Sequence, residues 1–336
     1  MNNKFFPSNF LFISIMILGT LMSLSSSHWL TMWMGLELNL MSFLPLMNIK
    51  GKMLEAEASM KYFIIQSLSS SVLIFGSIMM YIYNLSWYSM FNNTVTILIL
   101  LSLVLKLGGA PMHFWLPSIT KQMSWSILFL LLTWQKLAPL FMLSLINYNF
   151  MMIMIISVLS TLMGSLMALN QTNLQLIMTY SSISHLGWMM SMILINNSLT
   201  LFYFINYIII SIPLLHLINS EVGNQLFMLT QKNNTNSMII ISLILSLAGL
   251  PPLLGFMSKL IILISLINMK LFILSMFLLL GTLISLYFYL NMSLMLMIKS
   301  YSMFKTNKNI KNYKSLISLN LMSSFVIYPI VIMFIN

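Results

Sequence analysis

The sequence contains no cysteine, no aspartate and no arginine, and only 6% of its 336 residues are charged. Without cysteine, this chain has no disulfide, no thiolate metal site and no cysteine-ligated iron–sulfur cluster. A soluble domain carries about a quarter of its residues as charges, so this chain cannot cover a soluble surface. Hydrophobic residues make up 60% of the chain, and the mean hydropathy is +0.97. Its apolar surface must therefore face lipid or apolar partners.

The remaining charges are of only two kinds. All 15 basic residues are lysine and all 4 acids are glutamate, which gives a net charge of +11. Most of the common residues have A/T-rich codons, and the 35 methionines suit a genetic code with an extra methionine codon, so we predict an organelle genome. The lysines lie in loops on one side or inside helices, and they form no basic face with interleaved aromatics. We therefore predict no binding to nucleic acid.

Apolar runs of about 20 residues, the length that spans a bilayer, fill most of the chain. They predict an all-α integral membrane protein with about eleven transmembrane helices in a single polytopic domain, residues 1–336. A secretory signal peptide is an alternative for the first run, which lacks a clear small-x-small cleavage site. The predicted spans are 8–26, 28–47, 59–83, 94–117, 122–147, 149–169, 173–196, 198–218, 237–266, 270–295 and 315–335.

The lysines in the connecting segments fall on one side of these spans. With alternating loops, eleven lie on the side of the N-terminus and only Lys270 lies opposite. The positive-inside rule then places the N-terminus on the synthesis side and the C-terminus across the membrane. Five lysines occur in the loop 299–314, which indicates a topogenic, lipid-facing loop or a docking site for an acidic neighbouring subunit. The eleven are Lys4, Lys50, Lys52, Lys61, Lys121, Lys232, Lys299, Lys305, Lys308, Lys311 and Lys314.

Four charges fall well inside predicted spans: Glu37, Lys106, Lys136 and Lys259. A charge at the bilayer centre costs roughly 2.5–3.5 kcal/mol on insertion scales, and a lysine stem is too short to reach the interface from the midplane. Such charges pair with one another or line a hydrated cavity, and both arrangements occur in ion pathways. A lysine balanced between burial and pairing can load and release a proton near neutral pH. We predict a proton relay through these four residues.

Three further residues are secondary relay candidates. His113 and His185 lie at helical depth, where a histidine can join a relay or remain neutral and bond a carbonyl or water. Lys61 lies with Glu55 and Glu57 at the entry to the third span. Interfacial anchoring is the simpler interpretation of these three charges, and a proton entrance is the alternative.

Two spans carry glycine and proline at their centres. Such residues interrupt a helix, and irregular backbone inside a membrane is tolerated only where it is buried or lines water. The two breaks are five spans apart, so they predict inverted repeats at about 8–147 and 149–295, each with its fourth helix broken, followed by a C-terminal helix at about 315–335. Paired breaks are typical of a transport site. The residues are Gly108, Gly109 and Pro111 in the fourth span, and Gly249, Pro251 and Pro252 in the ninth.

These motifs resemble the antiporter-like subunits of respiratory complex I over most of the chain. The main stretch is LKLGGAPMHFWLP at 105–117. The others are LEAEASMKYF at 54–63, TWQKLAP at 133–139, YSSISHLGW at 180–188 and GLPPLLGF at 249–256. The length and the number of spans are similar to a short mitochondrial form found in animals, and we expect an insect source. Bacterial members have fourteen helices, so eleven fits the loss of three at the N-terminus.

The resemblance implies a role for each buried charge. Glu37 and Lys106 would form a switchable ion pair, Lys136 would be the central relay, and Lys259 would connect to the far side, although some relatives place glutamate there. Redox energy released elsewhere in the complex would shift the pairing and drive a proton along this axis. Flavin, iron–sulfur clusters and ubiquinone are expected in other subunits, with no cofactor or metal in this chain.

The resemblance also implies a location and partners. It implies a multi-pass subunit of the proton-pumping NADH:ubiquinone reductase in the mitochondrial inner membrane, with the N-terminus in the matrix and the C-terminus in the intermembrane space. Neighbouring antiporter-like chains and other membrane subunits would be its partners, and lipids such as cardiolipin are further candidates. A free-standing cation/proton antiporter is the alternative function. Haem-binding respiratory chains are disfavoured because four scattered histidines do not supply paired haem ligands.

Overall fold

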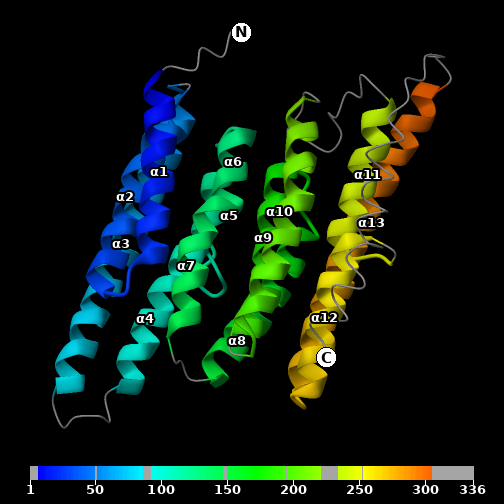
Figure 1. Cartoon of the computed structure of the whole chain (residues 1–336). Coiled ribbons are helices and arrows are strands. Elements are labelled where there is room, and N and C mark those ends of the chain that lie inside the picture. The colour runs from blue at the N-terminus through cyan, green and yellow to red at the C-terminus, as the bar shows by residue number, and fades with distance from the viewer. Residues whose placement is uncertain are drawn as a thin grey trace. The chain divides into compact units, whose positions relative to one another are not determined.

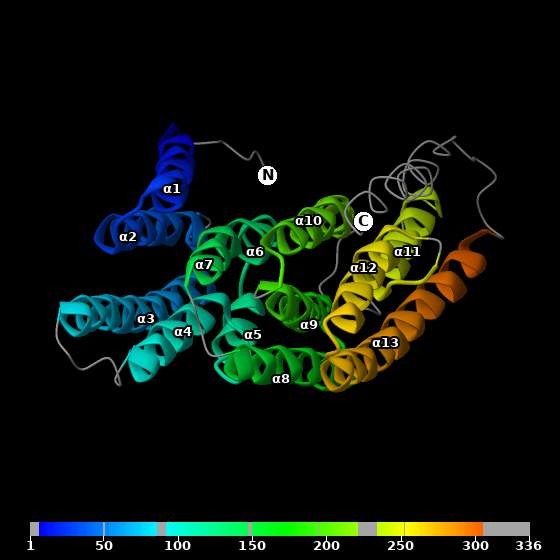
Figure 2. The same cartoon turned by 60° about the horizontal axis from the view of Figure 1, so that its bottom comes forward.

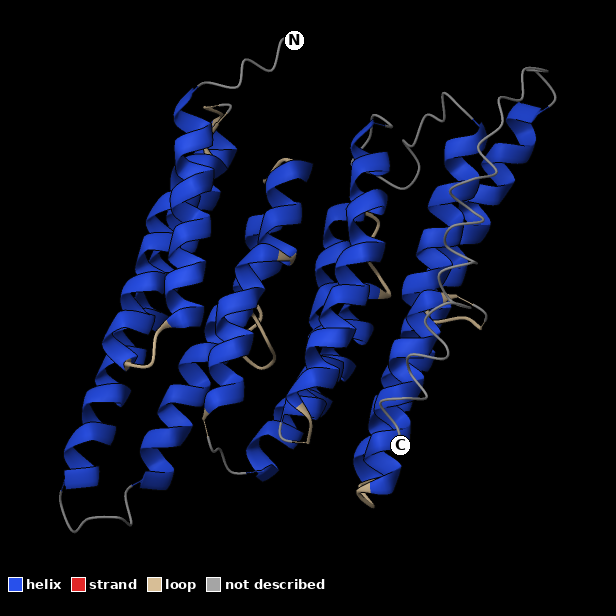
Figure 3. Ribbon diagram, viewed as in Figure 1, coloured by secondary structure: helices blue, strands red, loops and turns tan. Residues whose placement is uncertain are grey.

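The computed structural model describes residues 7–49, 51–85, 92–146, 150–193, 195–220, 234–251 and 253–304, and every regular element in them is a helix (Figure 3). The chain divides into two compact units, Met1–Ile156 and Ser157–Asn336. The boundary falls inside one helix, α8 (Phe150–Ala168).

In its described residues, the first unit contains seven complete helices. In Figures 1 and 2, α1 lies against α2, and α3 lies against α4. Three short helices, α5 to α7, complete the unit, and α7 packs on α4 and α1. The bounds are α1 Pro7–Ser25, α2 Trp29–Met47, α3 Met53–Leu85, α4 Asn92–Leu107, α5 Trp115–Thr120, α6 Trp125–Leu132 and α7 Trp134–Leu145.

Two glycines bring α1 and α2 into backbone contact. A Cβ atom added at Gly19 would lie 2.8 Å from the backbone nitrogen of Asn39, and one added at Gly35 would lie 2.7 Å from the carbonyl oxygen of Gly19. Small residues at a crossing allow two membrane helices to approach closely and gain van der Waals contact. The contact therefore fixes the middle of α2, where Glu37 and Asn39 lie.

The second unit is built around α9, whose twenty residues are almost all buried. Helices α10, α12 and α13 pack on α9, and α11 lies beside α13 (Figures 1 and 2). A Cβ atom added at Gly164 would lie 2.7 Å from the backbone nitrogen of Ser184, so α8 touches α9 as closely as α1 touches α2. The bounds are α9 Leu174–Ile193, α10 Asn197–Ser220, α11 Asn234–Ala248, α12 Leu254–Asn268 and α13 Phe272–Phe304.

Length and apolar composition qualify seven helical segments of the described residues to cross a membrane. Large apolar side chains are exposed along their outer faces, among them Phe10, Ile64 and Ile273, as expected for surfaces that meet lipid. Three shorter apolar helices are Thr94–Leu107, Ser237–Ala248 and Leu254–Asn268. The seven segments are Ser8–Ser25, Trp29–Met47, Met53–Ile82, Trp125–Leu145, Phe150–Ala168, Asn197–Asn219 and Phe272–Ile298.

The boundaries differ from the sequence-based prediction in three places. The third helix begins at Met53 rather than at 59, because the polar stretch LEAEA consists of good helix formers. The predicted span 122–147 is two helices, whereas within 94–117 and 237–266 the helices α4 and α11 end next to the glycines where the sequence predicted a break. Helix α13 continues to Phe304, past the predicted end at 295. The predicted C-terminal helix, Pro252, the loop beyond residue 304, and Lys4, Lys50 and Lys232 lie outside the described residues.

Candidate functional site

Helix α4 ends in a glycine turn next to Lys106. Gly108 has φ of 70°, a left-handed conformation that favours glycine. Its N–H donates to the Leu105 carbonyl at 3.2 Å, and the Gly109 N–H donates to the Val104 carbonyl at 3.0 Å. This pair of bonds is a Schellman motif, which terminates a helix and satisfies two of its last carbonyls. The sequence LKLGGAP therefore stops the helix one residue after Lys106.

Neutral side chains from neighbouring helices also donate to two of the carbonyls at this end. The Gln66 amide on α3 donates to the Lys106 carbonyl at 3.3 Å, and the Trp115 indole donates to the Leu105 carbonyl at 3.0 Å. A buried carbonyl without a partner costs about 1–3 kcal/mol. The broken end is thus stabilised without the lysine side chain, which is 8% exposed.

A second break, which sequence reasoning missed, lies next to Lys136. The N–H and the hydroxyl of Thr133 both donate to the Phe129 carbonyl, at 3.1 and 2.7 Å, and α7 begins at the next residue. Pro139, inside α7, has no N–H to bond the carbonyl of residue 135. Lys136 therefore lies in an irregular first turn and is only 2% exposed. No glycine marks this break, which is why the glycine and proline signals did not reveal it.

Lys106 and Lys136 line one cavity in the first unit. Its volume is about 20 Å³, and a cavity of about 10–15 Å³ holds one water when polar groups line it. The apolar part of the lining comes from leucines, Trp115 and Pro139. The polar lining residues are Asn39, Tyr62, Gln66, Lys106, Gln135 and Lys136. The cavity that both buried lysines line therefore has room for a water.

Glu37 lies beside this cavity but does not line it. It is half-buried on α2, next to the exposed Leu38 and Met41. A coulombic interaction links Glu37 to Lys106, but among the described residues no ion pair within 4 Å joins them. In this structure the glutamate therefore acts on the lysine through space rather than by direct contact.

The second unit repeats the glycine turn. Gly249 has φ of 84°; its N–H donates to the Ser246 carbonyl at 3.1 Å, and the Leu250 N–H donates to the Leu245 carbonyl at 3.3 Å. These bonds form a second Schellman motif, and it ends α11. Pro251 follows in the turn that leads to α12.

Lys259 on α12 caps this second helix end. Its ammonium donates to the Leu247 carbonyl at 3.2 Å and to the Ala248 carbonyl at 2.8 Å, and the side chain is 7% exposed. A cation at a helix C-terminus is favourable because the last carbonyls carry partial negative charge. A Cβ atom at Gly249 would lie 3.0 Å from this ammonium, so the glycine also leaves room for the lysine.

His185 on α9 lies between two small cavities of about 10 Å³ each. Its Nδ1 is 2.7 Å from the Tyr203 hydroxyl, and the Tyr207 ring is 5.2 Å away between centroids. One cavity lies between His185 and the two tyrosines of α10, and the other is lined by His185 and Lys259. The structure therefore brings His185 and Lys259 to one cavity of the second unit.

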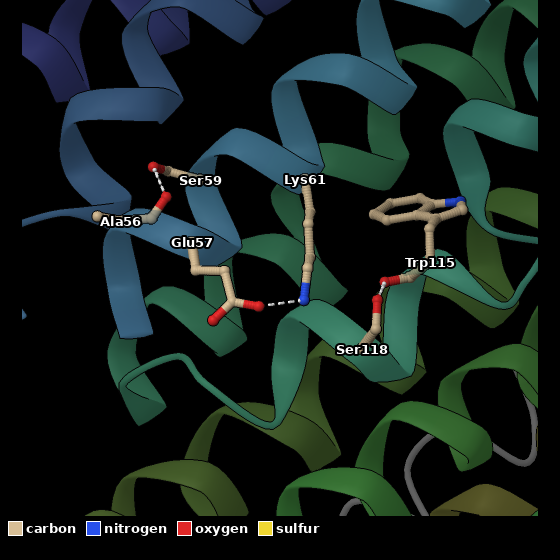
Figure 4. A network of polar contacts seen from close by, with 6 residues as sticks. All are labelled: Ala56, Glu57, Ser59, Lys61, Trp115 and Ser118. Carbon is tan, nitrogen blue, oxygen red and sulfur yellow. Dashed lines mark hydrogen bonds and ion pairs between the residues drawn. The ribbon is translucent and has the colours of Figure 1, made fainter. Parts of the chain in front are cut away.

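The other secondary candidates lie apart from these cavities. His113 is buried in the connection from α4 to α5 and stacks on Phe114, with 4.3 Å between ring centroids. Lys61 forms a 2.5 Å ion pair with Glu57 on the surface of α3 (Figure 4), with the two side chains 41% and 51% exposed. Glu55, two residues before Glu57, is buried. The exposed pair matches an interfacial anchor in its geometry.

Neutral polar residues are the part of the site that sequence reasoning missed. Asn39, Gln66 and Gln135 line the first cavity, and Tyr203 bonds His185 in the second unit. A usable signal was present for two of them, because Asn39 is two residues from Glu37 and Gln135 precedes Lys136. An amide inside a membrane helix needs a partner just as a charge does.

Comparisons with known proteins agree on one family. Residues 26–285 match the family described as NADH:quinone oxidoreductase/Mrp antiporter, transmembrane. The chain is 45% identical over 317 residues to NADH-ubiquinone oxidoreductase chain 2 of the insect Anopheles gambiae, covering 90% of this chain and 91% of the relative. The expectation of an insect source agrees with this relative.

Two solved structures share the fold. A chain of respiratory complex I from Thermus thermophilus with bound aureothin has a TM-score of 0.82 at 21% identity, over 98% of this chain and 79% of that one. A chain of the Mrp complex from Dietzia sp. DQ12-45-1b has a TM-score of 0.75 at 17% identity, over 85% of this chain and 59% of that one. The all-helical, antiporter-like fold predicted from the sequence is confirmed, while the count of eleven spans stays a prediction.

Proposed function

Because this chain belongs to the NADH:quinone oxidoreductase/Mrp antiporter family, as a relative of NADH-ubiquinone oxidoreductase chain 2, we propose that it translocates protons in the membrane arm of respiratory complex I. It would be a multi-pass protein of the mitochondrial inner membrane and a non-redox subunit of the NADH:ubiquinone reductase. Its partners would be neighbouring membrane subunits, including antiporter-like chains, with lipids such as cardiolipin at its surface. Flavin, iron–sulfur clusters and ubiquinone would reside in other subunits.

The observation that carries this proposal is the cavity shared by Lys106 and Lys136. Both lysines are buried, and the cavity that they both line is large enough for a water, which would connect the two ammonium groups. An amine gives up and regains a proton, whereas an arginine in the same place would stay charged. A proton on one lysine also opposes a proton on the other, since like charges repel strongly at short range inside a protein. Protonation of one lysine would therefore promote release from the other.

The other predicted residues would control proton exchange between the two lysines or carry the proton onward. A change in the distance from Glu37 to Lys106 would change the field at Lys106 and set its proton occupancy, and redox energy from elsewhere in the complex would drive that change. His185 and Lys259, which line one cavity in the second unit, would carry the proton toward the far side. His113 and Lys61 would be secondary participants, Lys61 at the surface entrance.

We further propose two inverted five-helix repeats, about 8–147 and 149–295, within eleven spans in a single membrane domain, followed by a C-terminal helix at about 315–335. The two Schellman turns support this proposal, since each ends the first half of a broken helix. The spacing in sequence from Tyr62 to Gly108 equals the spacing from Tyr203 to Gly249. The spacing from Gln66 to Gly108 likewise equals the spacing from Tyr207 to Gly249. The lysine asymmetry supports an N-terminus in the matrix and a C-terminus in the intermembrane space.

A free-standing cation/proton antiporter is the alternative function, and the same lysines would serve it. The relative that is 45% identical along nine-tenths of its own length is named as a chain of NADH-ubiquinone oxidoreductase, whereas the chain of the Mrp complex is only 17% identical. The proposal therefore favours a complex I subunit. Isolation of the chain only within a large NADH-oxidising assembly would support it.

The direct test replaces Lys136 by methionine in the assembled complex. We expect Lys136→Met to abolish most proton translocation by this subunit, so that fewer protons move per electron in proteoliposomes, while the complex still assembles. Lys121→Met is the matched control, because Lys121 is an exposed lysine of the same unit, and it should leave the ratio unchanged. A normal ratio in assembled Lys136→Met complex would refute the relay.

A further inference from the structure

The side chains of Asn39 and Gln135 form a closed amide pair between α2 and α7. Asn39 Nδ2 donates to Gln135 Oε1 at 3.0 Å, and Gln135 Nε2 donates to Asn39 Oδ1 at 3.0 Å. The two residues are far apart in the sequence, and the two reciprocal bonds fix both amides. Gly19 holds the α2 backbone at Asn39 from the other side. The pair is therefore a built feature of the helix packing.

The position of the pair links it to the relay. Both amides line the cavity of Lys106 and Lys136, and Gln135 directly precedes Lys136. Leu36, three residues before Asn39, and Leu40, the next residue, line the same cavity, whereas Glu37 does not. The amide pair therefore forms part of the cavity wall, beside these two apolar side chains, and joins α2 to α7 there.

The chemistry of the amide distinguishes this wall from the rest of the polar lining. An amide donates through N–H₂ and accepts through C=O, but it neither gains nor loses a proton near neutral pH. A proton relay needs groups that both take up and release a proton, as a carboxyl, an amine, an imidazole or a water does. Each amide retains a second N–H and a lone pair beyond the pair itself, so the wall can still hold a cavity water.

We propose that the Asn39–Gln135 pair is a proton-insulating seam that confines proton exchange of Lys136 to the cavity it shares with Lys106. The seam keeps the wall polar enough for water without offering a carrier along the α2–α7 contact. This inference rests on the proposed proton relay and assigns Asn39 and Gln135 as positioning residues rather than as members of the relay.

The test replaces an amide of the pair by a carboxyl of almost the same shape, which can carry a proton. Gln135→Glu keeps the side-chain length and can still accept a bond from Asn39, but its carboxyl can take up and release a proton. In complex I proteoliposomes without NADH, we expect an imposed pH gradient to decay several-fold faster than with the unmodified complex. Under NADH turnover, the ratio of protons to electrons should fall. Asn39→Asp places a carboxyl in the same pair and should act alike, so either assembled variant provides the test.

Two control variants distinguish a block to proton leak from a role of the amide pair in helix packing alone. Gln135→Met removes the pair without adding a carrier, so the membrane should remain as proton-tight as before. Ser42→Ala alters a buried hydroxyl on α2 that bonds only the Asn39 carbonyl of its own helix, and it should change neither reading. Equal decay in Gln135→Glu and Gln135→Met, whether slow or fast, would overturn the insulating role. Lost pumping in a proton-tight membrane with Gln135→Glu would also overturn it.

Lys136→Met is measured in parallel to keep the two proposals distinct. If Lys136→Met lowers the proton ratio while Gln135→Glu behaves normally, only the seam proposal fails. If Lys136→Met pumps normally, the relay itself fails, whatever the amide variants show.

Discussion

The two glycine turns end their helices with the same pattern of backbone bonds, but different kinds of side chain donate to the last carbonyls of the two helices. At the end of α4 the donors are the neutral amide of Gln66 and the indole of Trp115. At the end of α11 the donor is the ammonium of Lys259. Loss of charge at Lys106 would therefore leave the caps of α4 intact, whereas a neutral Lys259 would bond its two carbonyls more weakly. The comparison indicates that charge at Lys259 is coupled to local backbone stability and charge at Lys106 is not.

The largest expected difference between the two turns comes from removal of their lysines. Lys259→Met leaves two buried carbonyls without their donor, which should destabilise the protein by about 1–3 kcal/mol. Lys106→Met removes no cap and should lose proton translocation with a smaller change in stability. Thermal unfolding of the two variant complexes in the same detergent measures the difference. Equal unfolding temperatures would contradict the capping role of Lys259.

Lys259→Arg sharpens the same comparison by separating the cap from the proton carrier. Arginine keeps the charge and the donors but does not release its proton in proteins. We expect this variant to retain more of the unfolding temperature than Lys259→Met and still to lose translocation. Proton-to-electron ratios beside thermal unfolding give both readings. Translocation at the normal ratio would show that Lys259 need not release a proton.

Substitution of the turn glycines by alanine should cause the next largest loss of stability. Gly108 and Gly249 have φ of 70° and 84°, and a left-handed residue with a Cβ atom costs roughly 1–2 kcal/mol. Gly249→Ala should also displace the Lys259 ammonium, because the added Cβ atom would lie 3.0 Å from it. Gly249→Ala should therefore lower proton translocation as well as the unfolding temperature. A loss of stability alone would show that the glycine does not position the lysine.

Removal of the Gln66 amide, the neutral cap of α4, should destabilise the protein less than removal of the Lys259 ammonium from α11. Gln66→Met deletes one hydrogen bond to the Lys106 carbonyl, with a net cost of about 0.5–1.5 kcal/mol. Hydrogen–deuterium exchange at the end of α4 should report faster exchange there, and exchange at α11 should stay unchanged. Equal acceleration at both helix ends would indicate a general loss of packing instead of a lost cap.

Loss of the exposed ion pair on α3 should have the smallest effect on stability and on proton translocation. Glu57 and Lys61 lie four residues apart on α3 and face outward, and such pairs contribute about 0.2–1 kcal/mol. Glu57→Gln should therefore change the unfolding temperature very little and leave the proton ratio unchanged. A clear fall in the ratio would instead assign the pair to the proton entrance.

The charged residues of the candidate site could be predicted from the sequence, but its neutral polar residues could not. Charge inside an apolar run is visible without coordinates, which is why Lys106, Lys136 and Lys259 were found, and glycine beside proline marked both Schellman turns. The break at Thr133 has no such marker, because a threonine that bonds its own helix looks like any other helical residue in the sequence. The Asn39–Gln135 pair joins distant segments, and only tertiary packing brings them together.

The most direct test of the central claim is a density map of the assembled complex that resolves ordered water around this chain. The account predicts at least one water within hydrogen-bonding distance of both the Lys106 and the Lys136 ammonium groups, or a chain of waters that joins them, enclosed by Asn39, Gln66 and Gln135. Apolar side chains that fill the space between the two lysines and leave no room for water would contradict it.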